Sequence, residues 1–371
     1  MDFEEKKCWL AFNVFEGIGP VRFKLLFDYF GSAKDSFNAP PEKLREVGLG
    51  ENLVSRFLEF RKKFDAGLYM KRLERLGIII LCSTEENYPK LLKEIEGYPP
   101  LIYVRGEKEN KGETGERGIF HKKAIAVVGT RKVTGYGRQV TEMITEGLVL
   151  ADLVIVSGLA RGVDEIAHEV TIENNGLTIA VLGCGMDMIY PPEHKPLADK
   201  IVQSGGALIS EFPLGMQAVP GNFPARNRII SGLSLGVVVT EAAEDSGSLI
   251  TASDAAEQGR EVFAVPGPIT SSLSKGTSEL IKKGAKLITS AEDVLEELGI
   301  RRGEKKGDLR NMGDLGDEEI KIIKLLENEN LQIDEIARKL NLESARVGGL
   351  LSLMEIKGIV RNFGEGVYGL R

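Results

Sequence analysis

The chain has 371 residues, which is long enough for two or three domains, and 42% of them are hydrophobic. Its net charge of −7 excludes a uniformly basic nucleic-acid coat, so an anion site would have to be a local cluster of cations. Cys8, Cys82 and Cys184 offer neither a disulfide framework nor zinc-ligand spacing. We find no signal peptide and no bilayer-spanning run, and expect a reduced, soluble, cytoplasmic protein without metal, cofactor or membrane contact.

Residues 1–75 have helical periodicity. Two glycine turns, Gly17-Ile18-Gly19 and Gly48-Leu49-Gly50, each precede an amphipathic run. These turns are similar to those of helix-hairpin-helix (SAM-like) units, whose glycines let backbone amides approach a DNA phosphate. A plain helical bundle with glycine-capped turns explains them equally, and the acidic Glu51 after the second turn favours that interpretation.

Residues 76–300 alternate short apolar runs with helical periodicity. The runs are continuously apolar, so both faces of the resulting sheet should be covered. We therefore predict a Rossmann-like, doubly wound, mainly parallel α/β sheet. Two runs, GIIILC and LIYVRG, lie in residues 76–105, and seven more lie at 124–128, 153–157, 178–182, 207–210, 236–240, 261–265 and 286–288.

Two polar, glycine-rich stretches interrupt these patterns. We expect residues 106–118 to be an exposed loop and residues 301–315 to be a linker between domains. Residues 316–371 fit a winged helix: one helix, a helix-turn-helix and a hairpin wing. Its third helix begins with Glu343 and Arg346 in the same turn, which favours an accessory or protein-contact role over strong duplex binding.

The loops after the strands are the expected location of a ligand, because such sheets bind ligands outside the carboxyl ends of their strands. These loops are rich in Gly, Ser and Thr, which lets backbone amides approach an anion. Residues 118–141 contain five Lys or Arg and no carboxylate, which is notable in an acidic chain. The loops are residues 129–137, 157–168, 183–195, 210–215 and 240–252.

Nucleotide cofactors and catalysis find little support in these loops. The first turn lacks G-x-G-x-x-G spacing, and no P-loop motif is present. We interpret His168 and Cys184 as structural residues. Glu211 and Glu241 follow strands, so they could do acid–base chemistry or could accept backbone amides and order the loops.

Six motifs in order make the chain resemble the DNA processing protein A family, also called Smf: VVGTRKVTGYG, SGLARGVDEIAH, AVLGCGMDMIYP, FPARNRIISGLS, SGSLITASDAAEQGREVFAVPG and KGTSELIKKGA. The resemblance implies a Rossmann-like domain that binds single-stranded DNA without catalytic turnover. It also implies a homodimer that loads the RecA recombinase onto incoming strands in natural transformation. Single-strand-binding protein is a further expected partner.

The resemblance also suggests which residues contact the strand. Arg131 would clamp one phosphate, assisted by the helix that begins near Gly135, and the amides of residues 157–162 would hold the next. Tyr136 and Phe223 are candidates for base stacking, or core residues. The full set is Gly129, Thr130, Arg131, Lys132, Gly137, Ser157, Gly158, Leu159, Ala160, Arg161, Gly162, Gly183, Gly185, Lys195, Phe223, Arg226, Asn227 and Arg228.

One position departs from the family's pattern. The family usually places Lys or Arg directly after the Tyr-Pro of the third loop, where this chain has Pro192, followed by Glu193 and His194. Lys195 is the candidate replacement for that charge.

Three alternatives stay open. The dimer patch would be Leu280, Ile281, Leu287 and Ile288, or these residues simply cover the sheet as a helix and an edge strand. The α/β domain more distantly resembles nucleotide phosphoribohydrolases, in which case Glu241 and Arg226 would release a base from a nucleoside monophosphate. Finally, the chain could be a scaffold whose terminal modules do the binding.

Overall fold

The structure is a computed structural model, and it describes residues 1–106, 118–300, 316–326, 329–356, 359–364 and 366–370. Contacts divide the chain into two compact units, Met1–Arg301 and Arg302–Arg371. The predicted linker at 301–315 and most of the predicted loop at 106–118 lie outside the described residues. In the part of the chain that is described, no helix is long and apolar enough to cross a membrane.

Six helices form the N-terminal segment, around a core of aromatic side chains in which Phe12 and Phe57 stack with ring centroids 5.1 Å apart. Gly17 (φ 117°) and Gly48 (φ 98°) adopt the left-handed conformation that favours glycine, which confirms both predicted turns. The helices are α1 (Phe3–Val14), α2 (Pro20–Phe30), α3 (Ala33–Asn38), α4 (Pro41–Glu46), α5 (Glu51–Lys63) and α6 (Ala66–Arg75).

These helices are joined to the sheet by polar contacts and a shared core. Asn13 donates to the carbonyl of Glu211 at 3.0 Å and accepts from the Tyr103 hydroxyl at 2.7 Å. One hydrophobic cluster runs from Trp9 to Leu208. The helical segment therefore belongs to the same compact unit as the sheet, and residue 75 marks a change of secondary structure.

The central sheet has nine strands in the order β1-β2-β6-β5-β4-β3-β7-β8-β9. The seven strands from β3 onward are parallel, while β2 runs antiparallel to both β6 and β1. All nine predicted strands are present: β1 (Ile78–Cys82), β2 (Leu101–Arg105), β3 (Ala124–Val128), β4 (Val154–Ser157), β5 (Thr178–Val181), β6 (Ala207–Ser210), β7 (Gly236–Val239), β8 (Glu261–Ala264) and β9 (Lys286–Leu287).

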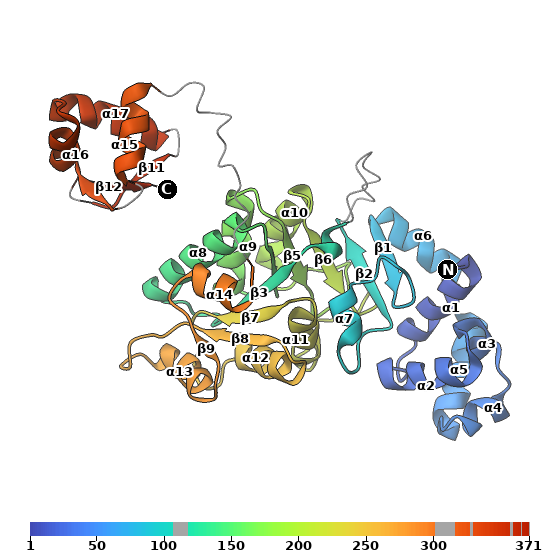
Figure 1. Cartoon of the computed structure of the whole chain (residues 1–371). Helices are drawn as coiled ribbons and strands as arrows, with labels where there is room; N and C mark the ends of the chain where they lie inside the picture. Colours follow the sequence, from blue (N-terminus) through green and yellow to red (C-terminus); the bar gives the residue numbers. More distant parts are fainter. Residues whose placement is uncertain (107–117, 301–315, 327–328, 357–358, 365, 371) are drawn as a thin grey trace. The chain divides into compact units, whose positions relative to one another are not determined.

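Helices cover both faces of this sheet (Figure 1), as its continuously apolar strands predict. One face packs under α8 (Gly135–Leu150), α9 (Val163–Glu173), α10 (Lys195–Gln203) and α14 (Ala291–Glu297). The other packs under α7 (Lys90–Glu94), α11 (Asn222–Gly232), α12 (Ser248–Glu257) and α13 (Lys275–Lys282). Short 3-10 turns are η1 (Ile119–His121), η2 (Pro192–His194) and η3 (Ser272–Ser274).

The strand order fixes where a ligand should bind. The chain runs outward from β3 through β4, β5 and β6, and then returns to the other side of β3 to continue with β7 and β8. Such a reversal opens a crevice beyond the carboxyl ends of the two central strands. The predicted location is therefore above β3 and β7.

The second unit is a small winged helix with its own core, which contains Ile322, Ile336, Val347 and Leu351. Its three-stranded sheet has the order β10-β12-β11. The elements are α15 (Asp317–Leu326), β10 (Leu331–Gln332), α16 (Ile333–Leu340), α17 (Ser344–Ile356), β11 (Val360–Asn362) and β12 (Val367–Leu370), which confirms the predicted fold.

Candidate nucleic-acid interface

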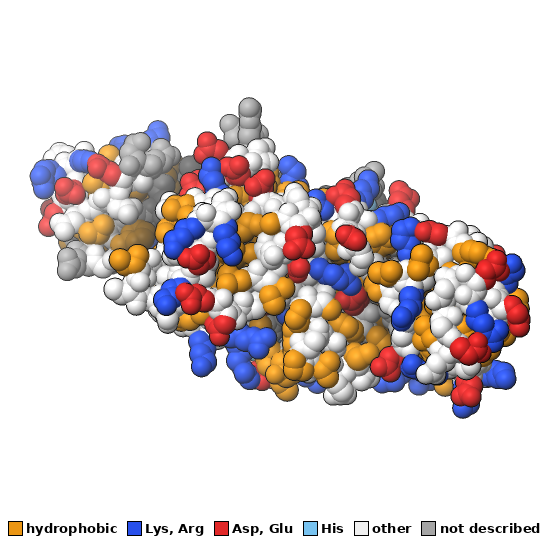
Figure 2. Space-filling model, turned by 90° about the horizontal axis from the view of Figure 1, so that it is seen from below, with side chains coloured by type: hydrophobic (Ala, Val, Ile, Leu, Met, Phe, Trp, Pro, Cys, Tyr) orange, Lys and Arg blue, Asp and Glu red, His pale blue; other side chains and the backbone are white. Residues whose placement is uncertain are grey.

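A crevice of about 540 Å³ opens at this switch point. It joins the loops after β3, β4 and β7 with the first turns of α11. Of the predicted contacts, eight line it: Gly129, Thr130, Arg131, Lys132, Ala160, Phe223, Asn227 and the buried Arg226. The face seen in Figure 2 intersperses basic and acidic side chains.

The loop after β3 is held by backbone contacts. The amide of Thr130 donates to the carbonyl of Glu241 at 2.7 Å, and the amide of Val163 donates to the carbonyl of Thr130 at 3.2 Å. A Cβ on Gly129 would lie 2.6 Å from Val163 Cγ2 and 2.7 Å from the Glu241 carbonyl oxygen. Gly129 is therefore required by close approach, and the loops that surround the crevice are fixed to one another.

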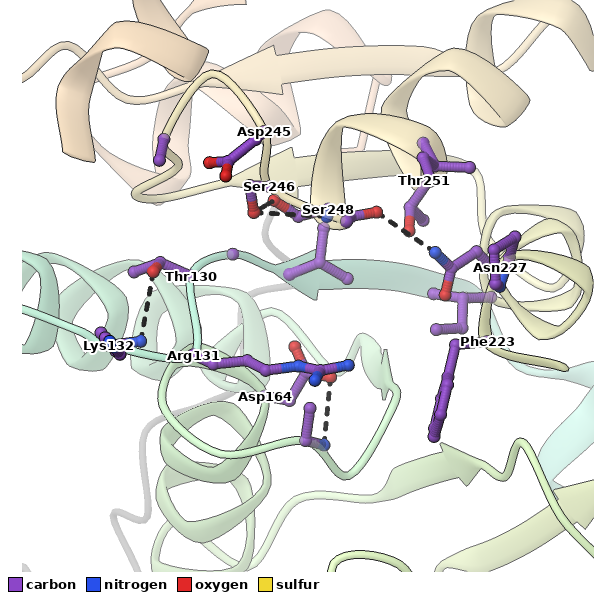
Figure 3. A pocket seen from close by; sticks show the side chains of 18 of the residues that line it. Thr130, Arg131, Lys132, Asp164, Phe223, Asn227, Asp245, Ser246, Ser248 and Thr251 are labelled. Carbon is purple, nitrogen blue, oxygen red and sulfur yellow. Dashed lines mark hydrogen bonds between the residues drawn. The ribbon is translucent and has the colours of Figure 1, made fainter. Parts of the chain in front are cut away.

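Arg131 is one of two exposed cations of this loop, beside Lys132. It extends across the crevice toward Phe223 (Figure 3), with its guanidinium carbon 5.6 Å from the ring centroid. The carboxylates that could brace it have other partners, since Glu211 pairs with Arg228 and Glu241 with Thr134. No described carboxylate forms an ion pair with Arg131, so its donors are available to an anion.

The start of α8 is not the second half of this phosphate site, which corrects our expectation for the helix near Gly135. The Glu241 carboxylate occupies that helix end: Oε2 accepts from the Thr134 amide at 2.9 Å and Oε1 from its hydroxyl at 2.7 Å. Thr134 Oγ1 in turn caps the amide of Gly137. An internal carboxylate thus uses the favourable helix dipole, and Gly137 leaves room for it.

The amides of residues 157–162 are also partly engaged, a second correction. Asp164 Oδ2 accepts from Gly158 at 3.1 Å and from Ala160 at 3.3 Å, and Glu165 accepts from Gly162 at 3.4 Å. Burial raises the pKa of Asp164, while the charge of Arg226 and these amides oppose the shift. The loop is ordered from within, and its backbone is less available for phosphate than its composition suggests.

Arg226 and Arg228 are structural cations, contrary to their prediction as strand contacts. Arg226 is 4% exposed, and its Nη1 donates to the carbonyls of Gly158 and Val181 at 2.5 Å each. Arg228 forms an ion pair with Glu211 in a different, aromatic-lined cavity. Both guanidiniums brace loops within the protein, so neither can meet a phosphate in this arrangement.

The other predicted contacts lie outside the crevice. A Cβ on Gly183 would lie 3.0 Å from the Phe223 ring, and one on Gly185 would lie 2.5 Å from the Pro213 carbonyl oxygen, so both glycines are sites of close approach. Arg161 and Lys195 are exposed beyond the rim. The stacking candidate Tyr136 bonds the carbonyl of Pro266 and does not line the crevice. The remaining predicted contacts, Ser157, Gly158, Leu159 and Gly162, are buried beside it.

The opposite wall follows β7 and lies mostly in the predicted ligand loop at 240–252, but none of its residues was among the individually predicted contacts. The helix α12 begins there at Ser248 with Gly247 as its N-cap, and the hydroxyl of Ser246 accepts from the Ser248 amide at 3.4 Å. Ser248, Ile250 and Thr251 of its first turns line the crevice, beside Asn227, which donates to the Gly247 carbonyl at 3.2 Å. The D-S-G-S run after a strand was the available signal. The missed residues are Asp245, Ser246, Gly247, Ser248, Ile250, Thr251 and Leu273.

The residues considered for catalysis have structural partners. His168 is fully buried with Nδ1 2.7 Å from the Thr178 hydroxyl, and burial lowers its pKa to about 3. Burial raises the pKa of Cys184 to about 11, which disfavours a thiolate nucleophile. Glu211 and Glu241 order their loops as described. These environments bear out the structural interpretation of His168 and Cys184.

The prediction of the dimer patch is wrong for one residue. Ile288 is completely buried in the core under α8 and α14, so it cannot form an exposed patch. Leu280 and Ile281 on α13 are half-buried, and Leu287 on the edge strand β9 is 47% exposed.

The fold defines a Rossmann-like protein with a crevice at its switch point and with a winged helix as its second unit. Comparison with protein families identifies the family. The chain belongs to the DNA recombination-mediator protein A family, whose model matches residues 79–299, and a DprA winged helix domain model matches residues 311–364.

Individual relatives agree with this assignment. The chain is 44% identical over 281 residues to DNA processing protein DprA of Streptococcus pneumoniae, covering 69% of this chain and 96% of that one. It is 38% identical over 296 residues to protein Smf of Synechocystis sp., covering 80% and 73%.

Solved structures of two relatives are also similar. The S. pneumoniae DprA structure matches with a TM-score of 0.65 and 34% identity, covering 80% of this chain and 96% of that one. DNA processing protein A of Helicobacter pylori, described with a single-stranded DNA binding mode, matches with a TM-score of 0.51 and 31% identity, covering 60% and 95%.

Proposed function

We propose that the crevice binds single-stranded DNA and that the protein acts without catalytic turnover. The observation that carries the proposal is Arg131, an exposed arginine that lies over an aromatic ring and has no ion-pair partner among the described residues. Family membership and the H. pylori relative support the same ligand.

The two walls of the crevice supply different contacts. On one wall, Arg131 offers two parallel donors for a phosphate, while Phe223 offers a ring face on which a base can stack. On the other, the start of α12 adds the positive end of its helix dipole, while its first amides already have partners: Ser248 donates to Ser246 Oγ at 3.4 Å and Leu249 to the Ser246 carbonyl at 3.0 Å. A positive track with an aromatic platform is what single-strand binders share.

The crevice carries both cations and carboxylates, so its attraction for an anion should be moderate. Arg131, Lys132 and Arg226 are opposed by Asp164 and Asp245. Asp164 accepts from amides and lies close to the charge of Arg226. The charge accessible to a ligand at the rim is therefore mainly positive. Backbone phosphates should therefore dominate affinity, with little dependence on base sequence.

The phosphoribohydrolase alternative loses its two candidate residues. Glu241 is 3% exposed, has both carboxylate oxygens bonded to Thr134 and does not line the crevice. Arg226 is bound to two carbonyls. We therefore infer a binding protein and not a hydrolase.

Loading of RecA is the second half of the proposal, and family membership supports it. A homodimer through Leu280, Ile281 and Leu287 would present two crevices to one strand. Acceleration of RecA filament growth on strands covered by single-strand-binding protein would support the loader role. Equal filament rates with and without saturating protein would contradict it.

Strand binding itself is tested by equilibrium titration of a labelled oligonucleotide and of its duplex at one salt concentration. We expect the single strand to bind more tightly to the full chain. Equal or tighter duplex binding would instead favour the winged helix as the DNA site.

A further inference from the structure

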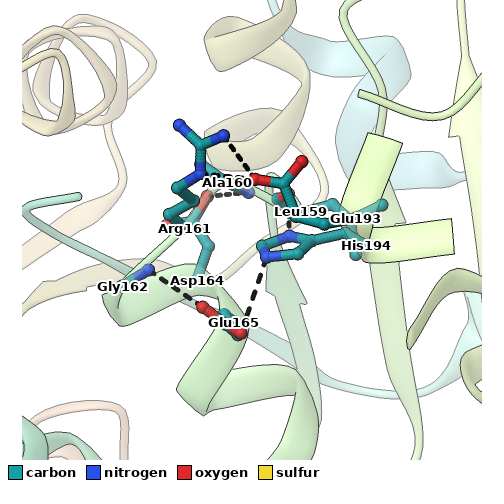
Figure 4. A network of polar contacts seen from close by, with 8 residues as sticks. All are labelled: Leu159, Ala160, Arg161, Gly162, Asp164, Glu165, Glu193 and His194. Carbon is teal, nitrogen blue, oxygen red and sulfur yellow. Dashed lines mark hydrogen bonds and ion pairs between the residues drawn. The ribbon is translucent and has the colours of Figure 1, made fainter. Parts of the chain in front are cut away.

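Arg161 is the second exposed arginine beside the crevice, and it already holds a carboxylate. Its Nε donates to Glu193 Oε1 at 2.6 Å, and Nη2 contacts the same oxygen (Figure 4). Both side chains are exposed, with 60% of Arg161 and 49% of Glu193 accessible. The pair thus lies in reach of an incoming strand.

The position of Glu193 is fixed by its neighbours. It belongs to η2, whose last residue, His194, is buried and places Nδ1 2.9 Å from the Leu159 carbonyl. His194 Nε2 lies 3.5 Å from Glu165 Oε1, and Glu165 accepts from the Gly162 amide. Figure 4 shows Gly162 and His194 both linked to Glu165. The turn that carries the carboxylate is therefore anchored to the loop that carries the arginine.

Arg161 is also next to the proposed strand path. The preceding residue, Ala160, lines the crevice. The following residue, Gly162, packs on the backbone of Thr130 and Arg131, at a φ of 78° that a side chain would strain. A strand that passes Ala160 on its way out of the crevice would next meet Arg161.

We propose that Glu193 competes with a DNA phosphate for Arg161 and thereby lowers the affinity of the single-strand site. Carboxylate and phosphate are both anions that take the arginine fork, so one must leave before the other binds. Hydrogen bonds from its own backbone amide and from Arg161 lower the pKa of Glu193, which keeps this competitor charged at neutral pH. The inference rests on the proposed single-strand function.

The test removes the competing charge with Glu193→Gln in the full chain. Because an exposed ion pair is a weak restraint, we expect the variant to bind a labelled oligonucleotide about 2- to 10-fold more tightly. Freed Arg161 would neutralise one more phosphate, so the slope of log affinity against log salt should steepen by about 0.7. Glu193→Ala should behave alike.

A matched pair at the opposite end of the strands provides the control. Lys122, before β3, and Asp152, before β4, form an exposed ion pair at 3.4 Å. Asp152→Asn changes the net charge as Glu193→Gln does, and asparagine tolerates the φ of 61° at that position. We expect its affinity and salt slope to match those of the unmodified chain.

Arg161→Ala in both backgrounds separates the specific mechanism from a general charge effect. In the unmodified chain the loss of strand affinity should be less than about 2-fold, because Glu193 already occupies Arg161 and little phosphate contact is lost with it. In the Glu193→Gln background it should abolish the whole gain. A gain that persists without Arg161, or one equal to that of Asp152→Asn, would overturn the inference.

The failure of this inference can be told from failure of the underlying function. If Arg131→Ala weakens binding while Glu193→Gln changes nothing, only the competition by Glu193 is refuted. If Arg131→Ala has no effect or no strand binds, both proposals fall. Equal melting temperatures of the variants establish that none of these results reflects unfolding.

Discussion

Replacing Arg131 by alanine probes the contact that carries the proposed function. The guanidinium is exposed, lies 5.6 Å from the Phe223 ring centroid and forms no ion pair with a described carboxylate. A charge-assisted contact to one phosphate contributes about 1.5–3 kcal/mol. The substitution should therefore weaken single-strand binding by about 10- to 150-fold.

The salt dependence identifies the lost contact as a phosphate. Fluorescence anisotropy of a labelled oligonucleotide across a salt series should show a slope smaller by about 0.7, the value for one single-strand phosphate. The loss should be similar for any base sequence, since phosphates carry no sequence information. The strand affinity of Arg131→Lys should lie between those of the unmodified chain and Arg131→Ala, because lysine keeps the charge but not the paired donors.

Lys122→Ala is the matched control for charge. Lys122 is exposed, pairs with Asp152 and lies before β3, at the opposite end of the strand that Arg131 follows. Its loss should leave affinity and slope unchanged. The reasoning is refuted if Arg131→Ala leaves the salt slope unchanged, or if it acts through a lower melting temperature instead.

Three further outcomes follow from the described geometry. Phe223→Ala should weaken strand binding by about 5- to 150-fold, for one lost stacking contact, and a salt slope that also changes would count against stacking. No adenine should be released from AMP, whereas Glu241→Gln should lower the melting temperature, because it disturbs the contacts to Thr134; release of adenine that this substitution abolishes would restore the hydrolase alternative. Since burial lowers the pKa of His168 to about 3, the unfolded chain binds its proton first, and stability should fall as pH drops below about 6.5, by roughly 1.4 kcal/mol per unit. Urea denaturation from pH 7 to pH 5 should show that the free energy of unfolding of His168→Asn depends less steeply on pH. An unreduced slope would mean that other groups cause the pH dependence.

The sheet and the location of the crevice could be predicted from the sequence. Continuous apolar runs determine the strands, and a ligand at their carboxyl ends is a property of the whole fold class. Arg131 lies in the loop after β3, in a stretch without carboxylates, and its phosphate-binding role is what the resemblance to the family implies. Only the structure shows that Arg131 is not paired with Glu211 or Glu241, since both acids follow strands that are distant in the sequence.

What the sequence could not show is which polar groups satisfy one another. Asp164 and Glu241 occupy amides that composition alone assigns to DNA, because burial forces them to find internal donors. Arg226 looks like a phosphate ligand in a basic motif, yet it is surrounded by carbonyls. Ile288 shares its apolar character with Leu287, yet Leu287 in β9 is 47% exposed while Ile288, directly after the strand, is completely buried.

The central claim, that the strand lies in the crevice above β3 and β7, is tested most directly by hydrogen exchange of the full chain with and without a saturating oligonucleotide. The account predicts slower exchange in residues 129–134, at the start of α11 and in residues 243–250, with little change in residues 1–75. Protection confined to residues 1–75 or to the winged helix would contradict it.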